Sequence, residues 1–169
     1  PDIDYHAIVG LRLEAQEKLA DVAVIATMDR DHFGHVMQAL ECGYDILLEK
    51  PISNKLEDCV ELCKAAEKMG RKVFICHVLR YTVFYQQIKR LIDEGGVGKV
   101  MSIEAMEQVG VHHYCHSYAR GNWHKEADSS PMILAKCSHD MDILQRITGF
   151  ILQKNIHCMK RQKIIANTF

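Results

Sequence analysis

The sequence predicts an α/β fold built on a parallel sheet, and three observations support this prediction. Short apolar runs alternate with amphipathic helical stretches through the first half of the chain. Glycine or proline stands at the ends of several of these segments. The 169 residues are 48% hydrophobic and 25% charged, which is ordinary for a globular protein. Such alternation is typical of βαβ units, in which helices cover parallel strands.

Charge and composition narrow the class of partner. A net charge of −1 argues against nucleic acid or an anionic membrane as the partner. Acidic residues and a histidine interrupt the amino end, so we expect no signal peptide there, and no apolar run approaches the roughly 20 residues that cross a bilayer. The seven cysteines include no Cys-x-x-Cys pair, which favours free thiols in a reducing compartment. We expect a cytoplasmic protein with a small-molecule substrate.

Three strands are predicted in the first half of the chain. They cover residues 21–27, 45–49 and 72–78, each a short apolar run bounded by polar or turn residues. Runs that are apolar throughout belong to sheets buried on both faces, so these strands should be parallel neighbours in one sheet.

Helical periodicity fills the intervals between these strands. Residues 8–19 and 31–42 place apolar side chains three and four positions apart, and a glycine follows the second stretch. Asn54 followed by Glu57 resembles a capping box and should begin a third helix.

The alternation changes near residue 81, where we place a domain boundary between residues 1–81 and 82–169. Beyond it, Thr82 should cap a helix, and an extended segment and an irregular segment should follow. Ser130-Pro131 should then begin a last helix by the cap-then-proline pattern. The helix is expected at 82–94 and the extended segment at 100–109. The irregular segment is expected at 110–130 and the last helix at 131–148.

The exit of the strand at 45–49 carries the strongest chemical signal. Glu49-Lys50-Pro51 places a carboxylate and an ammonium where the strand leaves the sheet. Ligands of open α/β sheets bind at the carboxyl ends of strands, and a partly desolvated lysine there can be tuned for proton chemistry. The alternative is a solvated ion pair on a loop, which contributes little.

The last helix carries a second cluster. Lys136, His139 and Asp142 are spaced three apart and should share one face, where they can hold a hydroxyl, accept its proton and orient the acceptor. The alternative is a solvated helix face. The buried stripe of this helix is expected to be Leu134, Cys137, Met141 and Leu144.

The segment before this helix offers two weaker signals. Residues 120–124 contain the only Trp, Trp123, which either anchors the loop or stacks against a flat ring. Four nearby residues could be read as a metal site, but adjacent residues rarely all point to one ion, and ordering a loop costs entropy. They are His112, His113, Cys115 and His116.

Together these residues resemble the Gfo/Idh/MocA family of NAD(P)-dependent oxidoreductases. The resemblance rests on Ala26-Thr27 followed by His32, on Glu49-Lys50-Pro51, and on the helix with His139 and Asp142. It implies a truncated Rossmann-like parallel sheet for dinucleotide binding, followed by the start of an α/β substrate domain. It also implies NAD or NADP as cofactor, a sugar, cyclitol or related polyol as substrate, and full-length relatives that are homo-oligomers.

The resemblance also implies roles for individual residues. Lys50, His139 and Lys136 are predicted to be catalytic, with His139 matching the family's general base. The predicted cofactor-binding residues are Thr27, Asp29, His32, Glu49, Lys50, Pro51 and Trp123. The predicted substrate-binding residues are His77, Arg80, Asn122 and Asp142. We also expect a cis Lys50–Pro51 peptide, and one pocket shared by Lys50, His139 and Trp123.

Two departures from the family pattern matter. Many of its sugar dehydrogenases carry an aspartate four residues before the histidine, and that position is Ala135 here, beside Lys136. This change keeps two alternatives open: an NAD-dependent glycosidase of the same fold, and a binding or regulatory relative without turnover. The chain also contains no Gly-x-Gly-x-x-Gly motif. We therefore expect a fragment that lacks the glycine-rich amino-terminal part and most of the carboxy-terminal sheet domain.

We expect the 169-residue chain by itself to bind NAD(H) negligibly and to turn over no substrate. Without the glycine turn, the pyrophosphate loses backbone donors and a helix amino terminus. The remaining contacts would have to offset an association cost of several kcal/mol. Calorimetric titration measures this affinity directly, and micromolar binding would contradict the expectation.

Overall fold

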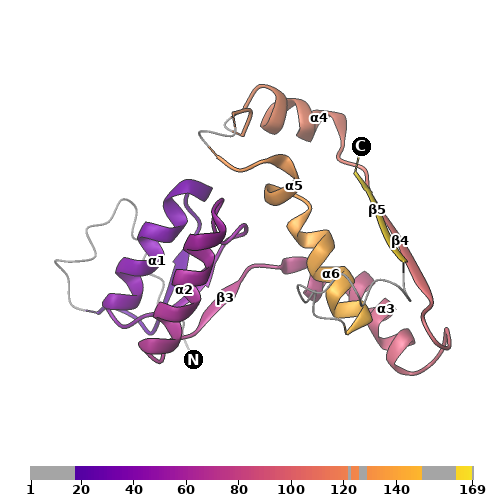
Figure 1. Ribbon diagram of the computed structural model, residues 1–169, viewed down its shortest axis with the longest axis horizontal. Coiled ribbons are helices and arrows are strands. Elements are labelled where there is room, and N and C mark those ends of the chain that lie inside the picture. The colour runs from indigo at the N-terminus through magenta and orange to yellow at the C-terminus, as the bar shows by residue number, and fades with distance from the viewer. Residues whose placement is uncertain (1–17, 122, 126–128, 150–162, 169) are drawn as a thin grey trace. The chain divides into compact units, whose positions relative to one another are not determined.

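The computed structural model describes residues 18–121, 123–125, 129–149 and 163–168, with the side chains of the last segment excepted. The helix expected at 8–19 lies almost entirely outside the described residues. The chain divides into two units, Pro1–Cys76 and His77–Phe169 (Figure 1). Each unit is described by itself.

A three-stranded parallel sheet forms the centre of the first unit. Its strands are β1 (Val22–Ile25), β2 (Asp45–Leu48) and β3 (Val73–Ile75), in that spatial order. The prediction of three parallel neighbours is therefore confirmed, although each strand is shorter than its apolar run.

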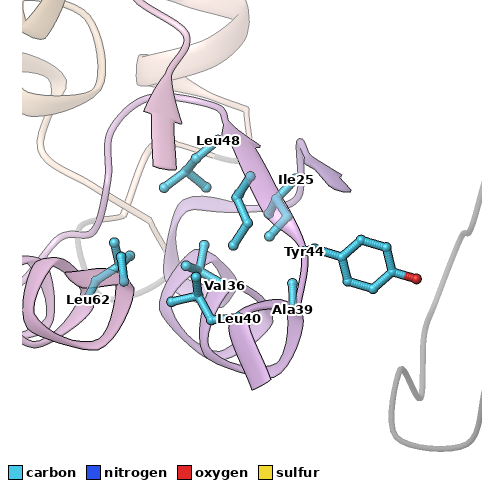
Figure 2. Close-up of a cluster of buried hydrophobic side chains, with 9 residues drawn as sticks. Ile25, Val36, Ala39, Leu40, Tyr44, Leu48 and Leu62 are labelled. Atoms are coloured by element: carbon cyan, nitrogen blue, oxygen red, sulfur yellow. The ribbon is translucent and has the colours of Figure 1, made fainter. Parts of the chain in front are cut away.

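Two helices cover one face of this sheet. They are α1 (His32–Glu41), which follows a 3₁₀ turn, η2 (Asp29–Asp31), and α2 (Leu56–Lys68). The core between sheet and helices is shown in Figure 2. It comprises Ile25, Val36, Ala39, Leu40, Tyr44, Ile46, Leu48, Leu62 and Ala66.

The other face of the sheet is exposed, which differs from the prediction of burial on both faces. Val24, Leu47 and Phe74 are aligned by the strand register and lie on this face, all of them exposed. Alternate side chains of a strand point to opposite faces, so a run that is apolar throughout supplies both faces while α1 and α2 cover only one.

The start of α2 also differs from the prediction. The residue before the helix is Lys55, and no side-chain cap bond is formed there, so the capping box of Asn54 and Glu57 is wrong. Ser53 instead forms the side-chain hydrogen bonds at the start of this helix. Its Oγ accepts the Lys55 N–H at 3.2 Å and donates to Asp58 Oδ2 at 2.9 Å. Its hydroxyl can do both at once, which explains why it is buried beside the helix start.

The second unit begins with η3, a 3₁₀ turn (Val78–Tyr81), and α3 (Val83–Asp93). Thr82 precedes α3 without capping it, because its hydroxyl donates to the Leu79 carbonyl at 2.9 Å. Since η3 packs against α3 and α6, it belongs to the second unit, which begins at His77. The domain boundary near residue 81 stays a prediction.

A two-stranded parallel ladder belongs to the same unit. Its strands are β4 (Ser102–Glu107) and β5 (Lys163–Thr168). The segment after β4 was expected to be irregular but contains a helical turn, α4 (Val111–His113), and a π-helical turn, η4 (Tyr114–Ala119).

The stretch 131–148, predicted as one helix, forms two helices. They are α5 (Met132–Ala135) and α6 (Ser138–Thr148), and α6 ends at Gly149 in the left-handed conformation, with φ 68°. Because the break turns α6 away from the register of α5, the expected stripe holds only in part. Cys137 and Leu144 are buried and Met141 is exposed, whereas the buried residues of α6 include Ile143 and Ile147.

Across the described ranges, no helix is both long and apolar enough to span a bilayer.

We expect Leu48→Ala to lower the free energy of unfolding by about 2–5 kcal/mol, because it leaves a cavity under two helices. Leu48 is 0% exposed, whereas its neighbour Leu47 is 37% exposed on the opposite face. Leu47→Ala is therefore the matched control and should cost clearly less. Chemical denaturation of both variants measures the difference, and equal losses would contradict the one-sided core.

Candidate functional site

The carboxyl edge of the three-stranded sheet carries the first cluster of candidate residues. Because the strands are parallel, the residues that follow β1 and β2 lie at the same edge. Thr27 follows β1 and is exposed, while Glu49 and Lys50 follow β2 and are half-buried. The peptide between Lys50 and Pro51 is cis, as predicted.

His32 joins these two turns. Its Nδ1 lies 2.7 Å from the Pro51 carbonyl oxygen and its Nε2 lies 3.2 Å from the Thr27 carbonyl oxygen. Both neighbours are acceptors, so a neutral ring donates to one of them and only an imidazolium donates to both. The side chain is 0% exposed. These contacts let His32 hold together the turns that carry Thr27 and Lys50, and its predicted part in cofactor binding stays a prediction.

Glu49 is placed by contacts within the same edge. Its Oε2 accepts the backbone N–H of Lys50 at 3.2 Å. Its carboxylate also faces Cys76, which follows β3: burial raises the pKa of the Cys76 thiol, and the charge of Glu49 raises it further. Asp29, another predicted cofactor residue, is buried in η2.

The second cluster surrounds Asp142 on α6. Its carboxylate is buried, at 6% exposure, and receives two guanidinium donors from Arg80. Arg80 Nε donates to Oδ2 at 2.6 Å, and Nη2 donates to Oδ1. His77 Nδ1 lies 3.1 Å from the same Oδ1. The hydrogen bond to Asp142 is the main cause of a raised pKa of Arg80.

His139 completes this cluster. Its ring lies against that of His77, with centroids 5.9 Å apart and planes at 74°. His77, Arg80, His139 and Asp142 therefore come together in the second unit, although 65 positions separate the first from the last. Asp142 is buried, and its oxygens are engaged by Arg80 and His77; its predicted part in substrate binding stays a prediction.

Lys136 lies apart from this cluster, in the break between α5 and α6. Its Nζ pairs with Glu107 Oε1 of β4 at 3.3 Å. The prediction that Lys136 shares one helix face with His139 and Asp142 is wrong, because three-residue spacing aligns side chains only along an unbroken helix. Ala135, at the position of the family aspartate, is buried.

A set of proton-bearing groups beside Lys136 was missed by sequence reasoning. Burial raises the pKa of Asp140, and the charge of Glu107 raises it further, against an opposing effect of Lys136. Burial likewise raises the pKa of Cys137 and of Tyr85, with Asp140 adding to both. The spacing of Cys137 and Asp140 was visible in the sequence, but the approach of Glu107 was not.

The loop predicted to reach the cofactor is held by backbone contacts. The Trp123 N–H donates to the Ser117 carbonyl at 3.2 Å. At Gly121 a Cβ atom would lie 2.0 Å from the His116 carbonyl oxygen, so only glycine fits there. Asn122 lies outside the described residues. The described residues contain no group of three or more His, Cys, Asp or Glu side chains that could hold a metal ion.

Lys50 belongs to the first unit, whereas His139 and Trp123 belong to the second. Their predicted convergence on one pocket stays a prediction.

Comparison with known proteins gives a match to one family. Residues 9–77 match the family GFO_IDH_MocA, described as an oxidoreductase family with an NAD-binding Rossmann fold. This match confirms the resemblance found from the sequence motifs.

Individual relatives cover most of this chain. An inositol 2-dehydrogenase/D-chiro-inositol 3-dehydrogenase of Lactiplantibacillus plantarum is 28% identical over 141 residues, which are 83% of this chain and 35% of that protein. A 2,7-anhydro-N-acetylneuraminate hydratase of Escherichia coli is 28% identical over 142 residues, 79% of this chain and 35% of its own length. The chain thus spans about a third of the length of these curated relatives.

A solved structure shares the fold. Scyllo-inositol dehydrogenase from Lactobacillus casei, with bound NAD(H) and scyllo-inositol, has a TM-score of 0.69 and 22% identity. The similarity covers 79% of this chain and 39% of that one. It supports the α/β fold with a parallel sheet.

We expect Asp140→Asn to raise the free energy of unfolding at neutral pH. A carboxyl whose pKa is raised by folding destabilises the folded state once it ionises, so the penalty is absent below its ordinary pKa of 3.8 and complete above the raised value. The advantage of the variant should therefore appear as the pH rises from about 3.8 and vanish below it.

Denaturation curves over this pH range measure the effect. Glu61→Gln, at an exposed position of α2, is the control and should change stability little at any pH. A variant that is less stable than the wild type at neutral pH would show that Asp140 is a stabilising anion.

Proposed function

We propose that the protein carrying this chain is an oxidoreductase that transfers a hydride between NAD or NADP and a sugar, cyclitol or related polyol. The observation that carries the proposal is the edge of the parallel sheet, where His32 fixes the turn that bears Lys50. The family match and the inositol dehydrogenase relative support the choice of reaction and substrate class.

The residues at this edge fit a dinucleotide in their chemistry. An exposed hydroxyl at Thr27 and a half-buried ammonium at Lys50 can donate to ribose hydroxyls and to a reacting oxygen. The nicotinamide, when bound, accepts or returns the hydride. In this proposal Lys50 polarises the hydroxyl under oxidation, and His139 takes its proton.

Residues 1–81 then form part of a dinucleotide-binding domain and residues 82–169 part of a substrate domain. Lys136 is the weakest of the three proposed catalytic residues, because its ammonium already pairs with Glu107. Cytoplasmic location and a homo-oligomeric assembly complete the proposal.

Three alternatives differ in their products. An NAD-dependent glycosidase and a hydratase would both end without net change of the nicotinamide, and one relative bears the name of a hydratase. A non-catalytic relative would give neither product nor absorbance change. The dehydrogenase relative and the retained pair of Lys50 and His139 favour net hydride transfer.

We expect Lys50→Met to lower kcat of the natural protein that contains this chain by about 100-fold or more, because an acid–base or polarising group contributes on this scale. The measurement is nicotinamide absorbance with a panel of inositols and sugars, paired with product analysis of a glycoside. Lys64→Met, at an exposed position of α2, is the matched control. Full activity of Lys50→Met would remove Lys50 from the mechanism, and glycoside cleavage without net reduction would favour the glycosidase.

A further inference from the structure

His77 stands between β3 and η3, in contact with two residues of α6. Its Nδ1 lies 3.1 Å from Asp142 Oδ1, and its ring lies edge-to-face with that of His139. The His77 side chain is 21% exposed, whereas the Asp142 side chain is 5% exposed. A partly exposed imidazole therefore rests on a buried carboxylate.

The carboxylate itself is held in place. Arg80 donates to both of its oxygens, so Asp142 cannot rotate away from His77 without breaking a bidentate pair. The carboxylate selects the tautomer of His77 that carries its proton on Nδ1. With Nδ1 engaged in this way, His77 exchanges protons with other groups through Nε2.

This arrangement has the parts of an aspartate–histidine pair in acid–base catalysis. The carboxylate orients the ring and balances the charge of the imidazolium once it forms. Among the described residues, Asp142 beside His77 favours the imidazolium, Arg80 on the same carboxylate opposes it, and His139 opposes it when protonated.

We propose that His77 is a second acid–base residue of this site, oriented by Asp142, and that it exchanges the proton of a substrate hydroxyl. The inference rests on the proposed function. During oxidation of a polyol, a C–H bond would break as the hydride passes to the nicotinamide, and the O–H bond would break as its proton passes to His139 and from there to Nε2 of the adjacent His77. The C=O bond forms, and the imidazolium of His77 remains beside the carboxylate of Asp142.

The ion pair is tested without cofactor or substrate. Nitrogen-15 NMR of the histidine rings in the complete protein should show neutral His77 protonated on Nδ1. In Asp142→Asn the titration midpoint of His77 should fall by about one unit or more, because an opposite charge at this distance favours the imidazolium. A neutral ring protonated on Nε2, or an unmoved midpoint, would overturn the role of Asp142.

Turnover tests the proton transfer. His77→Asn keeps an N–H donor near the position of Nδ1 but cannot accept a proton, so it should fold normally and lower kcat about 100-fold or more. KM should change far less, and the limb of the pH–rate profile that belongs to His77 should disappear. His112→Asn, at an exposed histidine of the same unit, is the matched control. Unchanged kcat and pH profile in His77→Asn would overturn the proposal.

The two failures are distinguishable. If the wild-type protein transfers no hydride to or from any polyol, the proposed function fails, and the acid–base role fails with it. The tautomer and the midpoint shift would still report whether Asp142 orients His77. If hydride transfer is present and His77→Asn retains it, the proposed function stands and this inference alone is wrong.

Discussion

A buried polar side chain must find hydrogen-bond partners, and this constraint organises both units of the chain. In the first unit the enclosed imidazole of His32 lies between the carbonyl oxygens of Thr27 and Pro51, and so joins the turns that follow β1 and β2. In the second unit the buried carboxylate of Asp142 pairs with the side chains of Arg80 and His77. Removal of the His32 imidazole or of the Asp142 carboxylate would leave its partners without these hydrogen bonds. Each buried group left unsatisfied would lower the stability of the fold by about 1–3 kcal/mol.

These contacts distinguish buried residues that hold their neighbours in position from partly exposed residues that carry the proposed proton transfers. His32 and Asp142 are buried, and their polar atoms are used within the protein. Lys50 and His77 are partly exposed and stand directly beside those supports. A rigid support fixes the position of a reacting group and reduces the reorganisation needed for proton transfer. In the proposed function, His32 and Asp142 would therefore determine where Lys50 and His77 lie.

The region around Ala135 lacks the aspartate that the family resemblance leads us to expect. Two acidic residues, Asp140 and Glu107, nevertheless lie near Lys136 in the folded chain. Burial and mutual repulsion raise the pKa of Asp140, so this carboxyl holds its proton to higher pH than a solvated one.

The sequence by itself determined the strands, the parallel sheet, the helices that follow β1 and β2, and the family resemblance, because hydrophobic periodicity and the Glu49-Lys50-Pro51 motif are local signals. It misplaced the start of α2 and missed the break at Lys136, because side-chain contacts and neighbouring elements decide such details. Only the tertiary structure showed that Asp142 pairs with Arg80 and His77, which lie about 60 positions earlier in the chain. Sequence spacing reports which residues share a helix face, but electrostatic partners are selected by distance in space, which only the folded chain supplies.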